Sequence, residues 1–213
     1  MKNVFVLFGK PGAGKGTRLS EFLNGREDQF QVLSVGNLLR KARKEQTELG
    51  KKAERFMDAG LLLPDEIINE IIIEAIKTSE KSIILDGSPR TVVQAMLLLE
   101  AGIYPKKVIN FEVDDETVIE RTRYRVVCNN CGESFTTNAF KHPKIEGICD
   151  KCGGALSRRK DDDEEVVKNR LQVYQNQTYP ALKIFENNHI QICTIDNTQD
   201  DAREKFETVM LEP

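Results

Sequence analysis

The sequence VFVLFGKPGAGKGT, residues 4–17, decides the fold of this chain of 213 residues. Its first part, Val4 to Phe8, is wholly apolar, as is typical of a strand that is covered on both faces of a sheet. Its second part, Gly9 to Thr17, is rich in glycine, which lets successive backbone N–H groups turn toward the oxygens of a phosphate. Lys15 adds a full positive charge, and the N-terminus of the helix that follows adds a partial one. The segment therefore predicts a phosphate-binding loop.

The end of this loop departs from the general phosphate-loop pattern, in which Ser or Thr follows the lysine directly. Here Gly16 stands between Lys15 and Thr17. The alternative is a glycine-rich turn without a ligand, which the flanking buried strand disfavours. The sequence also lacks Asn-Lys-x-Asp, the guanine-binding motif of GTPases. The residues that we expect to bind the phosphates of a donor nucleotide are Gly12, Ala13, Gly14, Lys15, Gly16 and Thr17.

Further apolar runs indicate buried strands, and helical patterns lie between them. The runs are Gln31–Ser34, Ser82–Leu85, Val108–Val113 and Ile190–Ile195. The clearest helix is Pro64 to Lys77, which has proline in its first turn and an isoleucine stripe at helical spacing. Strands that alternate with helices predict a parallel sheet with right-handed crossovers. We therefore expect an α/β fold of three layers around a five-stranded parallel sheet.

Composition limits where the chain acts and what it binds. Charged residues make up 31% of the chain, its net charge is −3 and its mean hydropathy is −0.43. The apolar run near the N-terminus is too short for a secretory signal or a membrane span. We therefore expect a cytoplasmic protein without a membrane partner. The net charge gives no general case for binding nucleic acid.

An acidic residue, Asp86, ends the apolar run that precedes Gly87. This position suits a carboxylate that holds Mg²⁺ through water molecules beside nucleotide phosphates. The alternative is an ordinary turn residue at the end of a strand. The phosphate loop and the nearby Arg90 favour the magnesium interpretation.

Residues 85–95, LDGSPRTVVQA, resemble the signature sequence of the adenylate kinase family. Residues 34–40, SVGNLLR, resemble a second family segment less closely, and the Gly-Lys-Gly-Thr ending of the phosphate loop is the variant of nucleoside monophosphate kinases. The similarity runs in the family's order from residue 3 to about residue 196. It implies reversible, Mg²⁺-dependent transfer of the γ-phosphoryl group of ATP to AMP, which gives two ADP, by a monomer.

The resemblance also implies a domain organisation. A P-loop kinase core would span residues 1–213 and carry two insertions. One is a helical flap over the monophosphate, residues 34–63, and the other is a lid over ATP, residues 126–162. Asp161 and Asp162 match the family's pair of aspartates at the hinge where the lid returns to the core.

The resemblance assigns further roles by position. The acceptor nucleotide would lie against Val35, Arg40, Gly87, Arg90 and Gln94, with the two arginines on its phosphate and Gln94 on its base. Arg121 and Arg125 would face ATP, and Arg159 and Arg170 would face both the acceptor and the phosphoryl group in transfer. Guanidinium groups are permanently charged planar donors that suit this chemistry. The expected catalytic residues are Lys15, Arg90, Arg121, Arg125, Arg159 and Arg170.

Four positions depart from the family pattern. Val35 stands where threonine is usual, Ser88 replaces a phenylalanine of the acceptor pocket, and Tyr124 replaces a glycine at the start of the lid. Asn37 replaces an aspartate that could pair with Arg159. These departures leave a second hypothesis open, in which UMP or CMP is the acceptor.

Two Cys-x-x-Cys pairs, Cys128 with Cys131 and Cys149 with Cys152, are separated by 17 residues. This spacing is typical of a Cys₄ zinc site, and four thiolates leave no open position on the metal, so the zinc would be structural. A lid of this size can bury little apolar surface, and a metal would supply the missing stability. The lid would resemble a zinc ribbon, and iron in the same site remains an alternative.

A hypothesis of another class is a zinc ribbon that binds nucleic acid. Such a ribbon would present a basic, aromatic surface. Its candidate residues are Phe135, Phe140, Lys141, Lys144 and Lys151. The arginines at both ends of the cysteine segment suit a lid over phosphates better, so we expect nucleotides rather than nucleic acid as partners.

Overall fold

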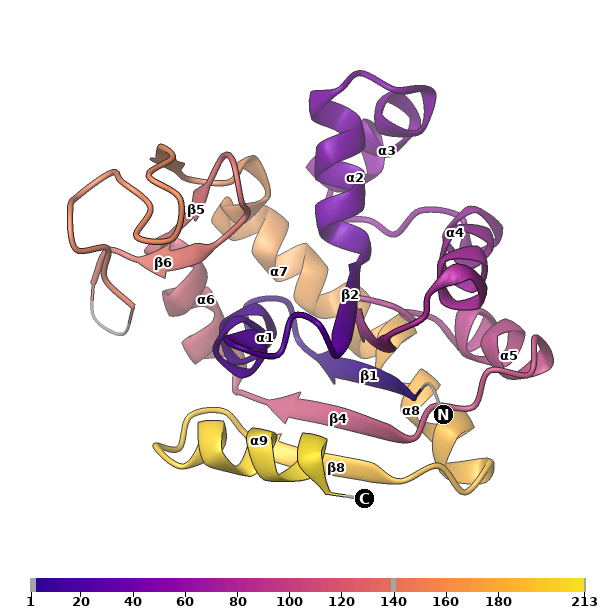
Figure 1. Ribbon diagram of the computed structural model, residues 1–213. Helices are drawn as coiled ribbons and strands as arrows, with labels where there is room; N and C mark the ends of the chain where they lie inside the picture. The colour runs from indigo at the N-terminus through magenta and orange to yellow at the C-terminus, as the bar shows by residue number, and fades with distance from the viewer. Residues whose placement is uncertain (1–2, 139–140, 213) are drawn as a thin grey trace.

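A parallel sheet of five strands, in the order β2-β3-β1-β4-β8, forms the centre of the molecule (Figure 1). The computed structural model describes residues 3–138 and 141–212. The strands are β1 Val4–Gly9, β2 Phe30–Ser34, β3 Ser82–Asp86, β4 Lys107–Glu112 and β8 Ile192–Asp196. The predicted α/β fold and its five-stranded parallel sheet are therefore confirmed.

The central strand β1 divides the protein interior into two cores. Val4, Val6 and Phe8 belong to the core on one face of the sheet, and Phe5 and Leu7 belong to the core on the other. This division follows from the alternation of side chains along a strand. Because helices cover both faces, every residue from Val4 to Phe8 is buried, as the apolar run predicts.

The helices form the two outer layers. The first core takes side chains from α2 Val35–Lys44, α3 Glu48–Asp58, α4 Asp65–Thr78, α5 Val92–Glu100 and α8 Ala181–Asn187. The second core takes side chains from α1 Lys15–Leu23, α6 Asp115–Arg123, α7 Glu164–Val173 and α9 Ala202–Leu211. The predicted helix Pro64–Lys77 is α4, for which Pro64 is the residue before the first turn.

The chain between Asp162 and Asn187 is largely helical but not one regular helix. A 3₁₀ turn at Lys160–Asp162 precedes α7, and a π-helical segment, Tyr174–Thr178, precedes α8. Tyr179 N–H donates to the carbonyl of Tyr174 at 2.8 Å, five residues back. Pro180 follows, and because proline has no N–H to donate, α8 starts afresh behind it.

A second, antiparallel sheet lies apart from the first (Figure 1). Its strands are β5 Arg125–Cys128, β6 Ser134–Thr136 and β7 Leu156–Ser157, with β5 in the middle. Within the part of the chain that the structure describes, the buried members of its core cluster are Cys128, Phe135 and Cys149. Figure 1 shows α2 and α3 above the main sheet, with β5 and β6 to their left in the view. Within the described residues, every helix falls short of the length and apolar character that crossing a membrane requires.

Candidate functional site

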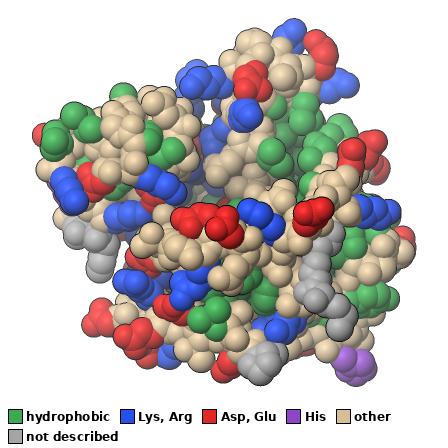
Figure 2. All heavy atoms as spheres, in the orientation of Figure 1, with side chains coloured by type: hydrophobic (Ala, Val, Ile, Leu, Met, Phe, Trp, Pro, Cys, Tyr) green, Lys and Arg blue, Asp and Glu red, His purple; other side chains and the backbone are tan. Residues whose placement is uncertain are grey.

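A cleft of about 950 Å³ lies between the carboxyl edge of the main sheet, α2 and the small sheet. Figure 2 shows the surface hollowed between these lobes, with Lys and Arg side chains beside the hollow. The predicted site residues that line it are Gly12, Gly14, Lys15, Gly16, Thr17, Val35, Arg40, Asp86, Gly87, Arg90, Gln94, Arg121, Arg125, Arg159, Asp161 and Arg170. Two predicted residues lie outside the lining: Ala13 is fully buried, and the carboxylate of Asp162 is turned to Arg125.

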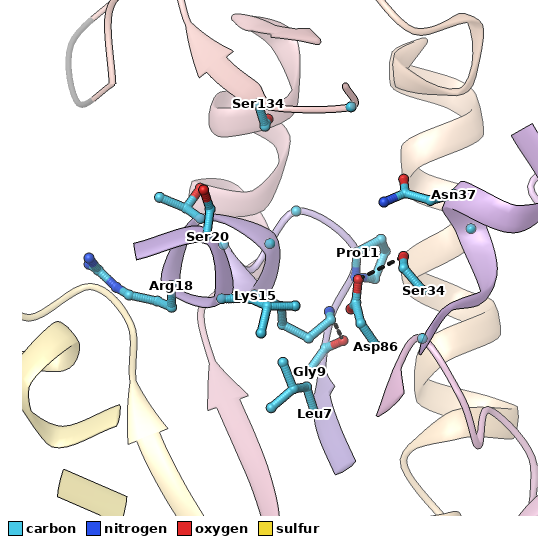
Figure 3. Close-up of a pocket in the computed structure, with 18 of the residues that line it drawn as sticks. Leu7, Gly9, Pro11, Lys15, Arg18, Ser20, Ser34, Asn37, Asp86 and Ser134 are labelled. Carbon is cyan, nitrogen blue, oxygen red and sulfur yellow. Dashed lines mark hydrogen bonds between the residues drawn. The ribbon is translucent and has the colours of Figure 1, made fainter. Parts of the chain in front are cut away.

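The phosphate loop joins β1 to α1 at one end of this cleft. Lys15 Nζ donates hydrogen bonds to the carbonyl oxygens of Gly9 at 2.6 Å and Lys10 at 2.8 Å, which hold it across the loop (Figure 3). Gly14, the residue before α1, has a φ of 88°, a conformation that suits glycine. The N-cap residue Gly14 makes no side-chain hydrogen bond to this end of α1. The backbone N–H groups of the first turn can therefore bind an anion.

Burial lowers the pKa of Lys15 to about 8. The negative charge of Asp86 opposes this shift, while the positive charges of Arg90 and other arginines add to it. The lysine therefore lies in a site that holds an excess of positive charge before any nucleotide binds.

Asp86 lies at the end of β3, opposite Ser34 at the end of β2. Ser34 Oγ donates to Asp86 Oδ2 at 3.0 Å, and Figure 3 shows the carboxylate beside the phosphate loop. Among the described residues, no side chain donates a hydrogen bond to the other carboxylate oxygen. A hard carboxylate oxygen at this place fits the chemistry that Mg²⁺ requires.

Five arginines around the cleft have a pKa below the ordinary arginine value. For each, burial is the first cause and repulsion from another arginine contributes, and the residues are Arg40, Arg90, Arg121, Arg159 and Arg170. The pKa of Arg159 falls to about 9. Its buried Nε has no hydrogen-bond partner within residues 3–138 and 141–212. Such a cluster stabilises an anion placed at its centre, because burial and mutual repulsion disfavour the positive charges until an opposite charge is present.

Two aspartates form ion pairs with arginines near the two ends of the chain segment that contains the small sheet. Arg125, at the start of β5, donates through Nε to Asp162 Oδ2 at 2.8 Å and through a second N–H to Oδ1. Arg170 donates to Asp161 Oδ2 at 2.9 Å. Burial acts to raise the pKa of Asp161, but the surrounding arginines, Arg170 first, lower it overall.

The other end of the cleft is built around the start of α5. Thr91 caps this helix by accepting from Gln94 N–H at 3.0 Å, and the backbone N–H of Arg90 donates to Gln94 Oε1 at 2.7 Å. Gln94 Nε2 donates to Asp65 Oδ1 at 2.8 Å. The amide orientation is thus set, and one hydrogen and one lone pair remain for a ligand.

The position of the Arg90 guanidinium group depends on the absence of a side chain at Gly87. Arg90 Nε donates to the carbonyl of Gly87 at 2.8 Å, and a Cβ at Gly87 would lie 2.6 Å from an Arg90 Nη. Any larger residue at Gly87 would displace the guanidinium group.

The residues that depart from the family pattern fall in different places. Val35 is buried and lines the cleft, whereas Ser88 is only 2% exposed and is absent from the lining. Asn37 Oδ1 accepts from Arg40 at 2.7 Å, so its contact is with Arg40 rather than Arg159.

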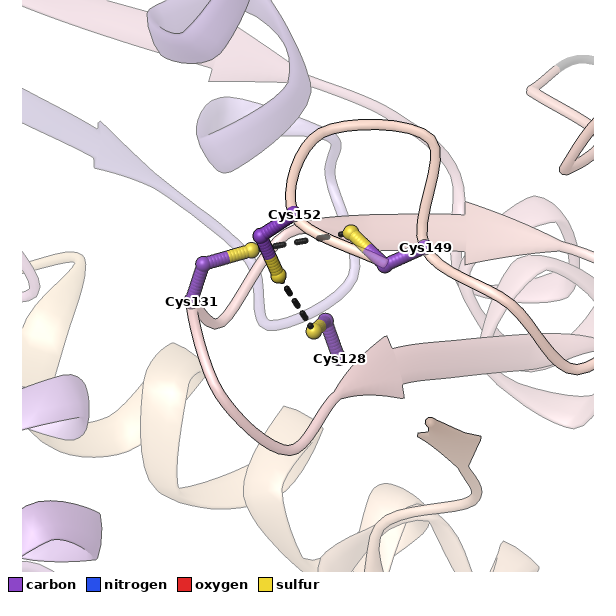
Figure 4. A group of neighbouring side chains, drawn as sticks. All are labelled: Cys128, Cys131, Cys149 and Cys152. Carbon is purple, nitrogen blue, oxygen red and sulfur yellow. Dashed lines mark hydrogen bonds between the residues drawn. The ribbon is translucent and has the colours of Figure 1, made fainter. Parts of the chain in front are cut away.

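The four paired cysteines converge in the small sheet (Figure 4). Their sulfur atoms all lie within 4.8 Å of one another, with Cys128 and Cys152 at 3.4 Å and Cys131 and Cys149 at 3.6 Å. Tetrahedral Zn²⁺ with bonds of about 2.3 Å requires sulfur separations of about 3.8 Å. The cysteines therefore fit a structural metal ion of this kind.

The aromatic residue proposed for a nucleic-acid surface is buried instead. Phe135 is 2% exposed in the core of the small sheet, and Lys141 Nζ lies 5.4 Å from the centre of its ring. Phe140 lies outside the described residues. Phe135 therefore offers no surface on which a base could stack.

Sequence reasoning missed several residues of the cleft. Glu133, in the segment between the cysteine pairs, accepts from Ser20 Oγ of α1 at 2.9 Å. Asn197, Thr198 and Gln199 follow β8 and line the cleft beside the phosphate loop. Their position after the last apolar run was the available signal, because ligands of parallel sheets bind at the carboxyl ends of the strands.

Comparison with known proteins agrees with this geometry. The model of the family described as adenylate kinase matches residues 7–190. Adenylate kinase from Caldicellulosiruptor saccharolyticus is 42% identical over 97% of this chain and 99% of its own length. Adenylate kinase from Caldicellulosiruptor bescii is 46% identical over 85% and 86%, and that from Methanosarcina barkeri is 42% identical over 96% and 95%. The chain therefore belongs to the adenylate kinase family.

Proposed function

We propose that this protein is a phosphotransferase that moves the γ-phosphoryl group of ATP reversibly to AMP and so forms two ADP. The observation that carries the proposal is the set of buried, mutually repelling cations around one cleft, with Lys15 of the phosphate loop at one end and Arg90 at the other. Two nucleotides that meet by their phosphates place negative charge where these cations lie. Family membership supports this substrate pair.

The chain's own residues act by position and charge. The phosphate loop and Lys15 hold the donor phosphates, and Arg40 and Arg90 hold the acceptor phosphate. Charge spread over the oxygens of the phosphoryl group in transfer is stabilised by Arg121, Arg125, Arg159 and Arg170. The unpaired Nε of Arg159 supplies one such donor. No covalent enzyme intermediate is needed, because positioning and electrostatic stabilisation carry this chemistry.

Two metal ions belong to the proposal. Mg²⁺ that enters with ATP neutralises phosphate charge, and Asp86 would hold it through water molecules. Zn²⁺ would be held by the four cysteines, Cys128, Cys131, Cys149 and Cys152, and would stabilise the small sheet without taking part in transfer.

The two insertions would exclude water from the cleft. In this proposal residues 34–63 close over AMP and residues 126–162 close over ATP, with the paired Asp161 and Asp162 at the lid's hinge. Water kept out of a closed site cannot hydrolyse ATP. The hydrogen bonds from Ser20 to Glu133 and from Lys44 Nζ to the Asn129 carbonyl, at 3.4 Å, support contacts of the lid with both α1 and the flap. The proposal also takes the protein to be a monomer that acts in the cytoplasm without nucleic-acid or membrane partners, as membership of the family suggests.

The acceptor base is tested by an assay of ADP formation from ATP and Mg²⁺ with AMP, UMP, CMP and GMP as separate acceptors. We expect AMP to be preferred by at least about 100-fold in kcat/KM, because the remaining donor and acceptor of Gln94 have fixed places. Preference for UMP or CMP would contradict AMP as substrate and retain the phosphotransferase. Absence of transfer to all four would overturn the proposed function.

The pKa of Lys15 predicts how ATP affinity depends on pH. Bound phosphates raise this pKa from its value of about 8 in the free protein, so binding favours the protonated lysine. Affinity should be constant below about pH 8 and fall above it, by up to about tenfold per pH unit. Titration calorimetry from about pH 7 to about pH 10 measures this. Lys15→Arg keeps its charge as the pH passes 8 and should remove the fall in affinity that begins there, leaving only the fall from Arg159 near pH 9. A flat profile for the unaltered protein would contradict the prediction.

A further inference from the structure

Asn197 occupies a fixed place where the main sheet meets the phosphate loop. It is the first residue after β8, and its N–H donates to the carbonyl of Glu112 at the end of β4, at 3.0 Å. Only 5% of the residue is exposed. Its backbone position is therefore set by the sheet itself.

The side-chain amide of Asn197 joins two parts of the donor site. Its Nδ2 donates to the carbonyl of Ala13 in the phosphate loop at 2.6 Å, and its Oδ1 accepts from Arg18 Nε of α1 at 2.8 Å. The fit against the loop is close, since a Cβ at Gly14 would lie 2.4 Å from Asn197 Nδ2. These two bonds fix the amide orientation, because a reversed amide would place its NH₂ group against Arg18 and its oxygen against a carbonyl.

The backbone of Asn197 holds a second arginine. Its carbonyl oxygen accepts from an Arg121 Nη at 2.9 Å. Burial lowers the pKa of Arg121, and the positive charge of Arg18 lowers it further, so the two guanidinium groups lie close enough to repel. One residue thus provides the oxygen acceptors that keep two like charges side by side at the cleft wall, where both arginines line it.

We propose that Asn197 is a positioning residue of the donor site, which holds the phosphate loop, Arg18 and Arg121 in the arrangement that receives ATP. The inference rests on the proposed function in taking the phosphate loop as the donor site. Asn197 acts through these groups and through the rigid end of β8. Its contacts are all at this end of the cleft, and Arg40, Arg90 and Gln94 at the acceptor end are bound to other residues.

The test compares Asn197→Ala and Asn197→Asp with the unaltered protein by titration calorimetry with ATP and by the KM values for ATP and AMP. Alanine removes both side-chain bonds. Aspartate keeps an acceptor for Arg18 but turns a second oxygen toward the Ala13 carbonyl. We expect the Kd and the KM for ATP to rise about tenfold or more in both variants, while the KM for AMP stays within about twofold. Asn197→Asp, which is nearly isosteric, carries the test if the alanine variant does not fold.

The matched control is Asn110→Ala. Asn110 is 3% exposed in β4, and its amide donates to Glu112 Oε1 at 3.3 Å rather than to the phosphate loop. We expect this change to lower the melting temperature and to leave ATP affinity unaltered. The inference would be overturned if the KM values for ATP and AMP changed equally in the Asn197 variants. It would also be overturned if the Kd for ATP stayed unchanged in them. Calorimetry with ATP alone separates this result from a failure of the proposed function, which concerns transfer to AMP.

Discussion

Replacing Lys15 with methionine is expected to lower turnover by about a thousandfold or more, the scale of losing a preorganised charge in a transferring site. Methionine keeps the length and apolar stem of the side chain but loses the charge and the hydrogen bonds to the carbonyl oxygens of Gly9 and Lys10. The fold should persist, because burial disfavours the charged lysine, as its lowered pKa records. A coupled assay of ADP formation and a thermal melt measure the two effects.

The matched control for this change is Lys183→Met, which alters an exposed lysine of α8 outside the cleft. It should leave turnover and melting temperature unaltered. Near-normal turnover of Lys15→Met would contradict the role of the phosphate loop. Low turnover together with an early melt would mean that the substitution had damaged the fold rather than the chemistry.

Replacing Cys149 and Cys152 together with serine is expected to abolish metal binding and to unfold the small sheet. Among the described residues, the core cluster of that sheet has three buried members, two of which are cysteines. A structural Zn²⁺ contributes about 10–16 kcal/mol in comparable peptides, far more than so small a core can replace. Metal content should fall from one ion per chain to none, and limited proteolysis should cut within residues 126–158. Activity should fall by about 100-fold, because Arg125 and Arg159 at the ends of this segment lose their fixed places.

Cys193→Ser is the control for the thiol substitutions. This fifth cysteine lies in β8, and burial raises the pKa of its thiol. The control should keep its metal and its resistance to protease. A doubly substituted protein that still bound one metal ion, or that melted and was cleaved like the unaltered chain, would show that the cysteines hold no structural metal.

The elements that could be predicted are those whose complete pattern lies within one short stretch of sequence. The run Val4 to Phe8 and the glycines after it contain both a strand and a loop, so the sheet and the phosphate loop followed directly from the sequence. The cysteine pairs were equally local, since a Cys-x-x-Cys turn needs only its own four residues and a second pair. Their convergence in space agrees with that prediction.

Contacts between distant residues could not be predicted in the same way. Asp65 and Gln94 are 29 positions apart, and Ser20 and Glu133 are 113 apart, so each bond depends on how whole elements pack. Asn197 carries no motif at all, and only its place at the end of β8 reveals its contacts.

The ion pair between Arg125 and Asp162 has an evolutionary consequence. These residues are 37 positions apart in the chain, yet they bring together the two ends of the segment that contains the small sheet. A segment whose ends meet can lengthen or shorten at little cost in loop-closure entropy, because that cost grows only with the logarithm of its length. The stability of the main sheet then does not depend on the length or the content of this segment. A lineage could exchange a metal-bound module for a smaller or differently stabilised one at this junction without altering the catalytic body beneath it.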